Sequence, residues 1–251
     1  MRELIACWQN TRAMVLIALC AALFVTVLIP FKLLTIVPGI TEIRPAAVLP
    51  IAFSILFGPI AAWGAAFGNV IGDFFGTIGP GSFFGVLGNF VYGYAPYRIV
   101  LAWRRQGQEL HSARGRLVFA FAIVSASALC AVIIALGIDF LKIVPFAFLV
   151  HTIFLNNLLL SLALAPLLVR GLERRIFRMK LGYREWLHPE QISRPILGRA
   201  GAPVLLALTM IVYCAMMFPG LMTAFPALAG NPKPFALAAC LLLFLASLLL
   251  L

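Results

Sequence analysis

The stretch GPIAAWGAAFGNVIGDFFGTIGPGSFFGVLGNFVYG, residues 58–93, decides the fold of this chain. Small residues recur along it every four positions, as Gly64, Gly68, Gly72 and Gly76 and then, after a Gly-Pro-Gly break, as Gly81, Gly85, Asn89 and Gly93. Residues four apart lie on one face of a helix. The stretch therefore predicts two helices, each with a face almost free of side chains, that pack tightly on each other.

The composition of the chain indicates whether such helices lie in water or in lipid. In water each glycine weakens a helix by about 1 kcal/mol, whereas in lipid small residues let helix backbones approach closely. The 251 residues are 63% hydrophobic and 11% charged, against roughly 45–50% and 25% for soluble domains. We therefore predict an all-α polytopic membrane protein that folds as one compact bundle.

The formal net charge of +11 does not indicate nucleic-acid binding. The basic residues cluster in loops between apolar runs, which is the pattern of cytoplasmic loops in membrane proteins. The five cysteines show no CxxC or His/Cys spacing, so we interpret them as small core residues and predict no metal site and no cofactor.

Apolar runs predict eight helical segments, at residues 13–31, 45–57, 59–77, 81–103, 117–136, 144–169, 202–218 and 235–251. The second and third are separated because Gly58-Pro59 interrupts an apolar run too long for one ordinary span. This division puts 15 of the 19 basic residues on the side of the N-terminus and leaves only Lys32, Arg44, Lys142 and Lys233 opposite. By the positive-inside rule both termini are cytoplasmic.

The segment after the sixth helix has a different pattern. Between residues 170 and 190, apolar side chains recur at three and four residues with arginines between them, which predicts an amphipathic helix in the inner membrane interface. It serves either as a positively charged membrane anchor or as a docking surface for a cytoplasmic partner. The chain then divides into a six-helix core (1–169), a basic interfacial segment (170–200) and two further transmembrane helices (201–251).

Polar residues within the apolar helices indicate a site. Helix directions and a rise of about 1.5 Å per residue place Asn69, Asp73, Asn89 and His151 at one level of the outer half, with Asn156 near the midplane. Polar groups in a membrane usually face the bundle interior or a wet cavity, so these predict a pocket open to the outside. The alternatives are hydrogen bonds across helix seams, an ion pair of Asp73 with Arg44 or Lys142, and a core histidine.

Several motifs resemble one family. They are Ala18-x-x-x-Ala22, Arg44-Pro45-Ala46-x-x-Leu49-Pro50, Leu56-Phe57-Gly58-Pro59 and the glycine helix over residues 64–73. Together these are similar to the S-components, the substrate-binding membrane subunits of energy-coupling factor (ECF) vitamin transporters. The resemblance covers residues 13–169, the six helices usual for such subunits.

The resemblance implies high-affinity binding of a small micronutrient at the outer face of a bacterial or archaeal plasma (inner) membrane. It also implies partners, a transmembrane T-component and two ATPases, with Ala18 and Ala22 in the contact with the T-component. The chain has no G-x-x-x-x-G-K-[ST] motif, so ATP hydrolysis falls to the partners. The candidate substrate-binding residues are Arg44, Asn69, Asp73, Asn89, His151 and Asn156.

Two alternatives remain at this point. One is an independent secondary transporter in which Asp73 or His151 couples transport to protons. The other is a membrane-embedded enzyme, which is disfavoured because the three histidines lie in different regions and no H-E-x-x-H motif or acid pair appears. The few charges near the predicted pocket favour a neutral or weakly charged ligand.

The charge pattern generates a prediction about topology. In a background without native cysteines, a membrane-impermeant thiol reagent added from outside should label a cysteine at position 41 but not one at position 108. The reverse labelling would contradict the division at Gly58-Pro59.

Overall fold

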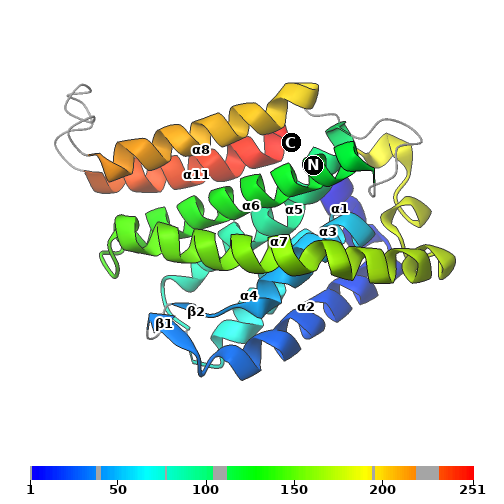
Figure 1. The fold of residues 1–251 in the computed structure, drawn as a ribbon, viewed down its shortest axis with the longest axis horizontal. Helices are drawn as coiled ribbons and strands as arrows, with labels where there is room; N and C mark the ends of the chain where they lie inside the picture. Colours follow the sequence, from blue (N-terminus) through cyan, green and yellow to red (C-terminus); the bar gives the residue numbers. More distant parts are fainter. Residues whose placement is uncertain (1, 38–40, 77, 104–111, 194–195, 219–231) are drawn as a thin grey trace.

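The computed structural model describes residues 2–37, 41–76, 78–103, 112–193, 196–218 and 232–251, so position 108 lies outside the described residues. The chain is a bundle of helices with one short hairpin (Figure 1). The elements are α1 (Arg2–Gln9), α2 (Thr11–Phe31), β1 (Thr35–Val37), β2 (Thr41–Glu42), α3 (Val48–Phe57), α4 (Ile60–Asp73), α5 (Ser82–Trp103), α6 (Ala113–Phe140), α7 (Phe146–Arg178), α8 (Gly201–Met217) and α11 (Pro232–Leu250).

All eight apolar segments expected from the sequence are helical, as α2 to α8 and α11. Among the described residues, four segments are long and apolar enough to cross a membrane, at Thr11–Phe31, Ala113–Phe140, Phe146–Glu185 and Gly198–Met217, and two shorter apolar helices accompany them. The chain is therefore an all-α polytopic membrane protein. The short helix α1 and the hairpin β1–β2 were not expected.

The glycine stripe of α4 packs against α2. A Cβ atom added to Gly64 would lie 2.5 Å from the Cβ of Cys20, and one on Gly68 would lie 2.8 Å from the ring of Phe24. The next glycine, Gly72, faces Leu28 in the same way. Two four-residue repeats thus interlock. Helices α4 and α5 do pack on each other as predicted, but the glycine stripe of α4 faces α2 instead of α5.

The stripe of α5 serves two neighbours. Gly85 and Gly93 face α4, where an added Cβ would meet the Asn69 amide at 2.8 Å and the Ala61 carbonyl oxygen at 2.5 Å. Gly88, by contrast, faces Ile134 of α6. Gly88 lies three residues after Gly85, outside the four-residue repeat. At about 100° per residue it points about 60° away from Gly85 around the helix, which directs it to α6 instead of α4.

The break at Gly58-Pro59 divides α3 from α4 as expected. Gly58 has a φ of +65°, a conformation that favours glycine, and an added Cβ would lie 2.9 Å from the Cβ of Tyr183. The segment after α7 therefore folds back onto this turn and buries Tyr183 and Trp186.

This return corrects the helix expected over residues 170–190. Its first part is the continuation of α7, which ends at Arg178, and Lys180 then adopts a left-handed φ of +54°. Two short 3-10 turns follow, at Tyr183–Glu185 and Pro189–Gln191. The apolar residues are spaced as in a helix, but the later ones pack on the bundle rather than lie along the membrane surface.

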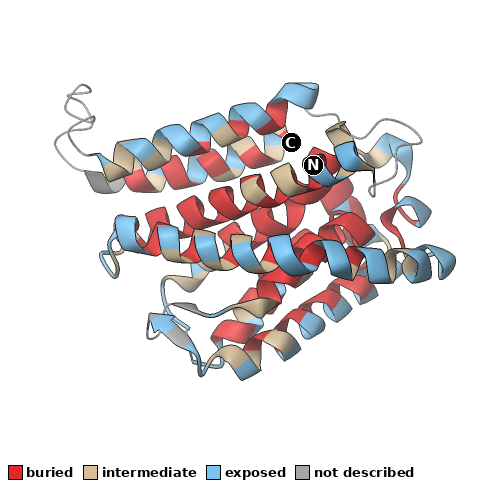
Figure 2. Cartoon of the chain, viewed as in Figure 1, coloured by how far each residue is buried: buried red, intermediate tan, exposed pale blue. Residues whose placement is uncertain are grey.

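Helices α8 and α11 form an antiparallel pair on one side of the bundle (Figure 1). Helix α11 lies against α5 and α6, and α8 packs on α6, α7 and α11. Burial is concentrated on α5 and α6, whereas α8 presents much of its surface outward (Figure 2). The two additional helices thus cover the side of the core opposite α2.

The interlocked α2–α4 contact predicts the effect of a single methyl group. Gly64→Ala should lower thermal stability, by about 1–3 kcal/mol, because the Cβ of Cys20 cannot move away by side-chain rotation. Adding Cys20→Gly should restore part of the loss. The control is Gly171→Ala in α7, where an added Cβ meets nothing within 4 Å. The unfolding temperature of this variant should be unchanged or slightly higher. Equal effects at both glycines would contradict the interlocking.

Candidate functional site

Asn69 is the centre of a buried polar cluster between α4 and its neighbours. Its side-chain oxygen accepts hydrogen bonds from Nη2 of Arg44 at 2.8 Å and from Nδ2 of Asn89 at 3.0 Å. Its own Nδ2 donates to Oδ2 of Asp73 at 3.1 Å, one helical turn further along α4. Gly85 makes room for this amide, because any side chain there would collide with it.

Arg44 enters the cluster because the chain turns back into the bundle after the hairpin. Its main-chain N–H donates to Oδ1 of Asn156 at 3.3 Å. Asn156 lies ten residues after the start of α7, about 15 Å along that helix. The 3-10 turn Pro45–Ala47 and α3 therefore begin inside the bundle, and the guanidinium reaches α4 from there.

Lys32 joins the cluster from the end of α2. Its Nζ lies 4.0 Å from Oδ1 of Asp73, and both side chains are about nine-tenths buried. Lys32 follows Leu28 by four residues, so it continues the row of α2 side chains that faces the glycines of α4. The sequence assigned Lys32 to the loop after the first predicted helix and suggested only Arg44 or Lys142 as partners of Asp73.

A cavity of about 120 Å³ adjoins this cluster. One wall is polar and is formed by Arg44, Asn69 and Asp73. The opposite wall is apolar and is formed by isoleucines of α6, α7 and their connection, and the segment 78–82 before α5 closes one side. The isoleucines are Ile134, Ile138, Ile143 and Ile153. An apolar wall facing a few convergent polar groups is the usual composition of a small-molecule site.

The structure brings together five of the six candidate residues. Three of them line the cavity, whereas Asn89 and Asn156 stand behind it, each bonded to a lining residue. His151 is elsewhere: it is exposed, and its Nε2 lies 2.8 Å from the hydroxyl of Tyr213 on α8. The expected convergence of His151 on the pocket is wrong because Ile153 faces the cavity, and a residue two positions earlier points about 200° away around the helix.

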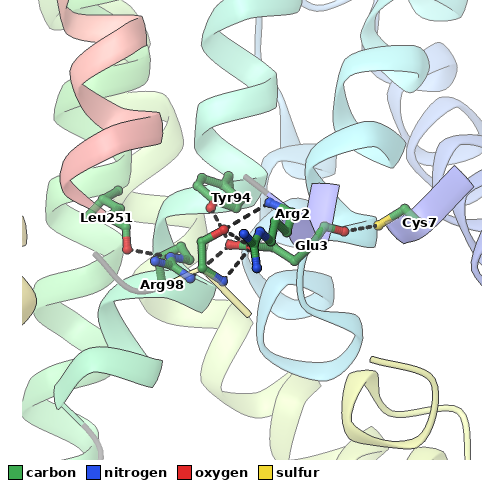
Figure 3. Close-up of polar contacts among 7 residues, drawn as sticks. Arg2, Glu3, Cys7, Tyr94, Arg98 and Leu251 are labelled. Carbon is green, nitrogen blue, oxygen red and sulfur yellow. Dashed lines mark hydrogen bonds and ion pairs between the residues drawn. The ribbon is translucent and has the colours of Figure 1, made fainter. Parts of the chain in front are cut away.

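Sequence reasoning missed a polar contact at the other end of the bundle (Figure 3). Glu3 of α1 is fully buried and accepts hydrogen bonds from Nη1 of Arg98 at 2.9 Å and from the hydroxyl of Tyr94 at 2.8 Å. Ser193 donates to its second oxygen through both its N–H and its hydroxyl, and Arg98 also donates to the main-chain oxygen of Leu251. This contact joins α1, α5, the segment after α7 and the end of α11.

Burial by itself raises the pKa of Glu3, but the hydrogen bonds from Ser193 and the charge of Arg98 more than offset it and lower the pKa to about 2. No motif in the sequence points to this pairing. An acidic residue at position 3 and an arginine near the end of an apolar run are both usual at membrane boundaries, and only folding makes them partners.

Ala18 and Ala22 both lie on the exposed side of α2. The opposite side of the helix carries Cys20, Phe24 and Leu28, which pack against α4. The two small residues, one turn apart, thus face away from the bundle.

Comparison with known proteins decides the family. A family model described as QueT transporter matches residues 14–174, more than half of the chain. The chain belongs to the QueT transporter family. No curated protein and no solved structure matches the chain.

Membership confirms the resemblance to ECF S-components, because QueT is an S-component. QueT is also a family of transporters, not of enzymes, which excludes the membrane-embedded enzyme. The protein is therefore a multi-pass membrane transporter component for a small-molecule micronutrient. The match ends at residue 174, so it includes the cavity residues and most of α7 but not α8 and α11.

The buried Glu3 predicts how stability depends on pH. Since its pKa falls from 4.5 in the unfolded chain to about 2 in the fold, its ionisation stabilises the protein above pH 4.5, and this stabilisation is lost as the pH falls toward 2. The contribution is about 3 kcal/mol. Thermal unfolding in detergent between pH 2 and 7 should show this loss in the unaltered protein. The Glu3→Gln variant should not show this acid-dependent loss of stability, and its stability at pH 7 should be lower than that of the unaltered protein.

The matched control is Glu190→Gln, which removes an exposed carboxylate from the 3-10 turn Pro189–Gln191. It should retain the pH profile of the unaltered protein. If both variants lose the same part of the profile, the acid-dependent loss does not come from Glu3.

Proposed function

We propose that this protein is the substrate-binding subunit of an ECF-type transporter that takes up a queuosine precursor, the compound class associated with the QueT family. The observation that carries the proposal is the cavity at Asn69, where a guanidinium, an amide and a carboxylate face an isoleucine wall. The substrate is bound from the outer side of the membrane, and both termini are cytoplasmic.

The cavity residues suit a compact polar heterocycle. Arg44 supplies donors, Asp73 supplies acceptors, and the amide of Asn69 offers both. The isoleucines supply an apolar surface for the face of a flat molecule. At about 120 Å³ the cavity is small beside the roughly 300–1,000 Å³ of typical drug-sized sites, which favours a ligand with few atoms.

The polar groups are held in position before the ligand arrives. Asn89 and Asn156 bond to Asn69 and Arg44 from behind, and Lys32 lies beside Asp73. Fixing these side chains in advance reduces the entropy lost on binding, which supports high affinity from a small contact area.

Energy for uptake comes from partner ATPases through a T-component that contacts the Ala18 and Ala22 face of α2. Small residues at lipid-exposed positions allow close packing of another helix. In this arrangement α2 contacts the partner with one side and the glycine helix of the binding site with the other.

The cavity generates a prediction about affinity. Asp73→Ala should weaken binding of a queuosine precursor, measured by calorimetry on the purified protein, by roughly ten- to a hundredfold, because hydrogen bonds to charged groups contribute about 1.5–3 kcal/mol. Asn69→Ala should weaken it less, by up to about tenfold, because a hydrogen bond of a neutral amide contributes about 0.5–1.5 kcal/mol. His151→Ala should bind normally, since His151 lies outside the cavity.

Thermal stability should be measured beside affinity for the same variants. If Asn69→Ala lowers the melting temperature while affinity is unchanged, Asn69 only forms hydrogen bonds within the bundle and the substrate binds elsewhere. Uptake by cells that lack every ECF ATPase would contradict the assignment to this class and favour a secondary transporter.

A further inference from the structure

An open groove of about 620 Å³ lies at the end of the bundle opposite the cavity, where α1 meets α2. Its rim is polar and includes Asn10, Thr11 and Arg12, at the start of α2. Its floor is apolar and includes Val15 and Leu16 of α2 and Leu181, which follows α7. The groove plays no part in the substrate site.

The polar rim and the apolar floor of the groove lie at different depths in the membrane. The candidate span on α2 begins at Thr11, so the rim lies at the boundary of the hydrocarbon layer. Val15 and Leu16 lie about one turn further along α2, some 6 Å deeper. A groove that is polar at the interface and apolar below it matches the two parts of a phospholipid.

Helix α7 contributes positive charge at the same level. Its 33 residues extend about 50 Å, well beyond the roughly 30 Å of hydrocarbon, so its last turns reach the headgroup region. The end of α7 and the start of α2 lie at the same end of the bundle (Figure 1). Lys180, next to Leu181, is exposed, as are Arg174 and Arg178 on the last turns.

From these observations we infer that the groove between α2 and the end of α7 binds an anionic phospholipid. One acyl chain lies along Val15, Leu16 and Leu181, and the phosphate lies at Arg12 and Lys180. The main-chain N–H groups of Arg12 and Ala13 are already bonded to the side chain of Asn10, so the cationic side chains are the phosphate donors. Each basic residue at a membrane surface increases the affinity for anionic lipid about fivefold.

The test uses delipidated protein in detergent, to which phosphatidylglycerol or phosphatidylcholine with identical acyl chains is added. Native mass spectrometry then measures the lipid bound. The unaltered protein should bind phosphatidylglycerol about tenfold or more tightly than phosphatidylcholine. In the double variant Arg12→Gln/Lys180→Gln this preference should fall to near one.

The control pair is Arg114→Gln/Arg199→Gln, which removes two exposed arginines outside the groove, and its preference should equal that of the unaltered protein. Leu181→Trp should reduce binding of both lipids by filling the groove. All variants change exposed or half-buried side chains, and equal melting temperatures without lipid verify that they fold.

Three results would overturn the inference. The first is equal binding of the two lipids by the unaltered protein, which shows a groove without charge selectivity. The second is an equal loss in the control pair, which assigns the preference to diffuse positive charge. The third is full binding by a folded Leu181→Trp, which places the lipid outside this groove. None of these results depends on the identity of the transported substrate.

Discussion

The close approach of α2 and α4 is the contact on which the rest of the structure depends. Three glycines of α4 lie directly against Cys20, Phe24 and Leu28 of α2, with no space for a side chain on the glycine side. In lipid there is little hydrophobic force between helices, so packing at short distance provides much of the association energy. The glycines weaken α4 as an isolated helix, but they allow this packing.

The interlocked row continues without a break into the proposed site. Four residues beyond Leu28 comes Lys32, which lies beside Asp73, and Asp73 bonds to Asn69. The position of α2 therefore fixes the position of the site's carboxylate. The exposed side of the same helix carries Ala18 and Ala22, so the proposed partner surface and the proposed substrate site share one rigid element.

The opposite end of the bundle is held by a different interaction. The buried Glu3–Arg98 pair and its hydrogen bonds connect α1 and α5 to the segment after α7 and to the end of α11 (Figure 3). Removing one partner of a buried pair leaves the other charge uncompensated, so such a pair enforces a single arrangement of the elements that meet there. In this chain it connects α11, which lies outside the family match, to a helix of the core.

The sequence by itself determined the class of protein, the approximate bounds of eight helices and the break at Gly58-Pro59. These follow from local rules: apolar run length, helix periodicity and the conformations open to glycine and proline. It also singled out Asn69, Asp73, Asn89 and Asn156, because polar side chains in apolar helices are costly and therefore conspicuous, and Arg44 through the motif that begins there. The structure joins these five residues in one hydrogen-bonded cluster.

Only the tertiary structure decided which helix each glycine stripe contacts and which polar residues meet. A stripe drifts around its helix by an amount that sequence spacing gives, but its neighbour depends on how all the helices pack. His151 illustrates this limit: its depth was estimated from the rise per residue, whereas its direction depends on the rotation of α7, which packing sets. Lys32, Glu3 and the isoleucine wall were missed for the same reason, since their partners lie far away in the sequence and are brought together only by the fold.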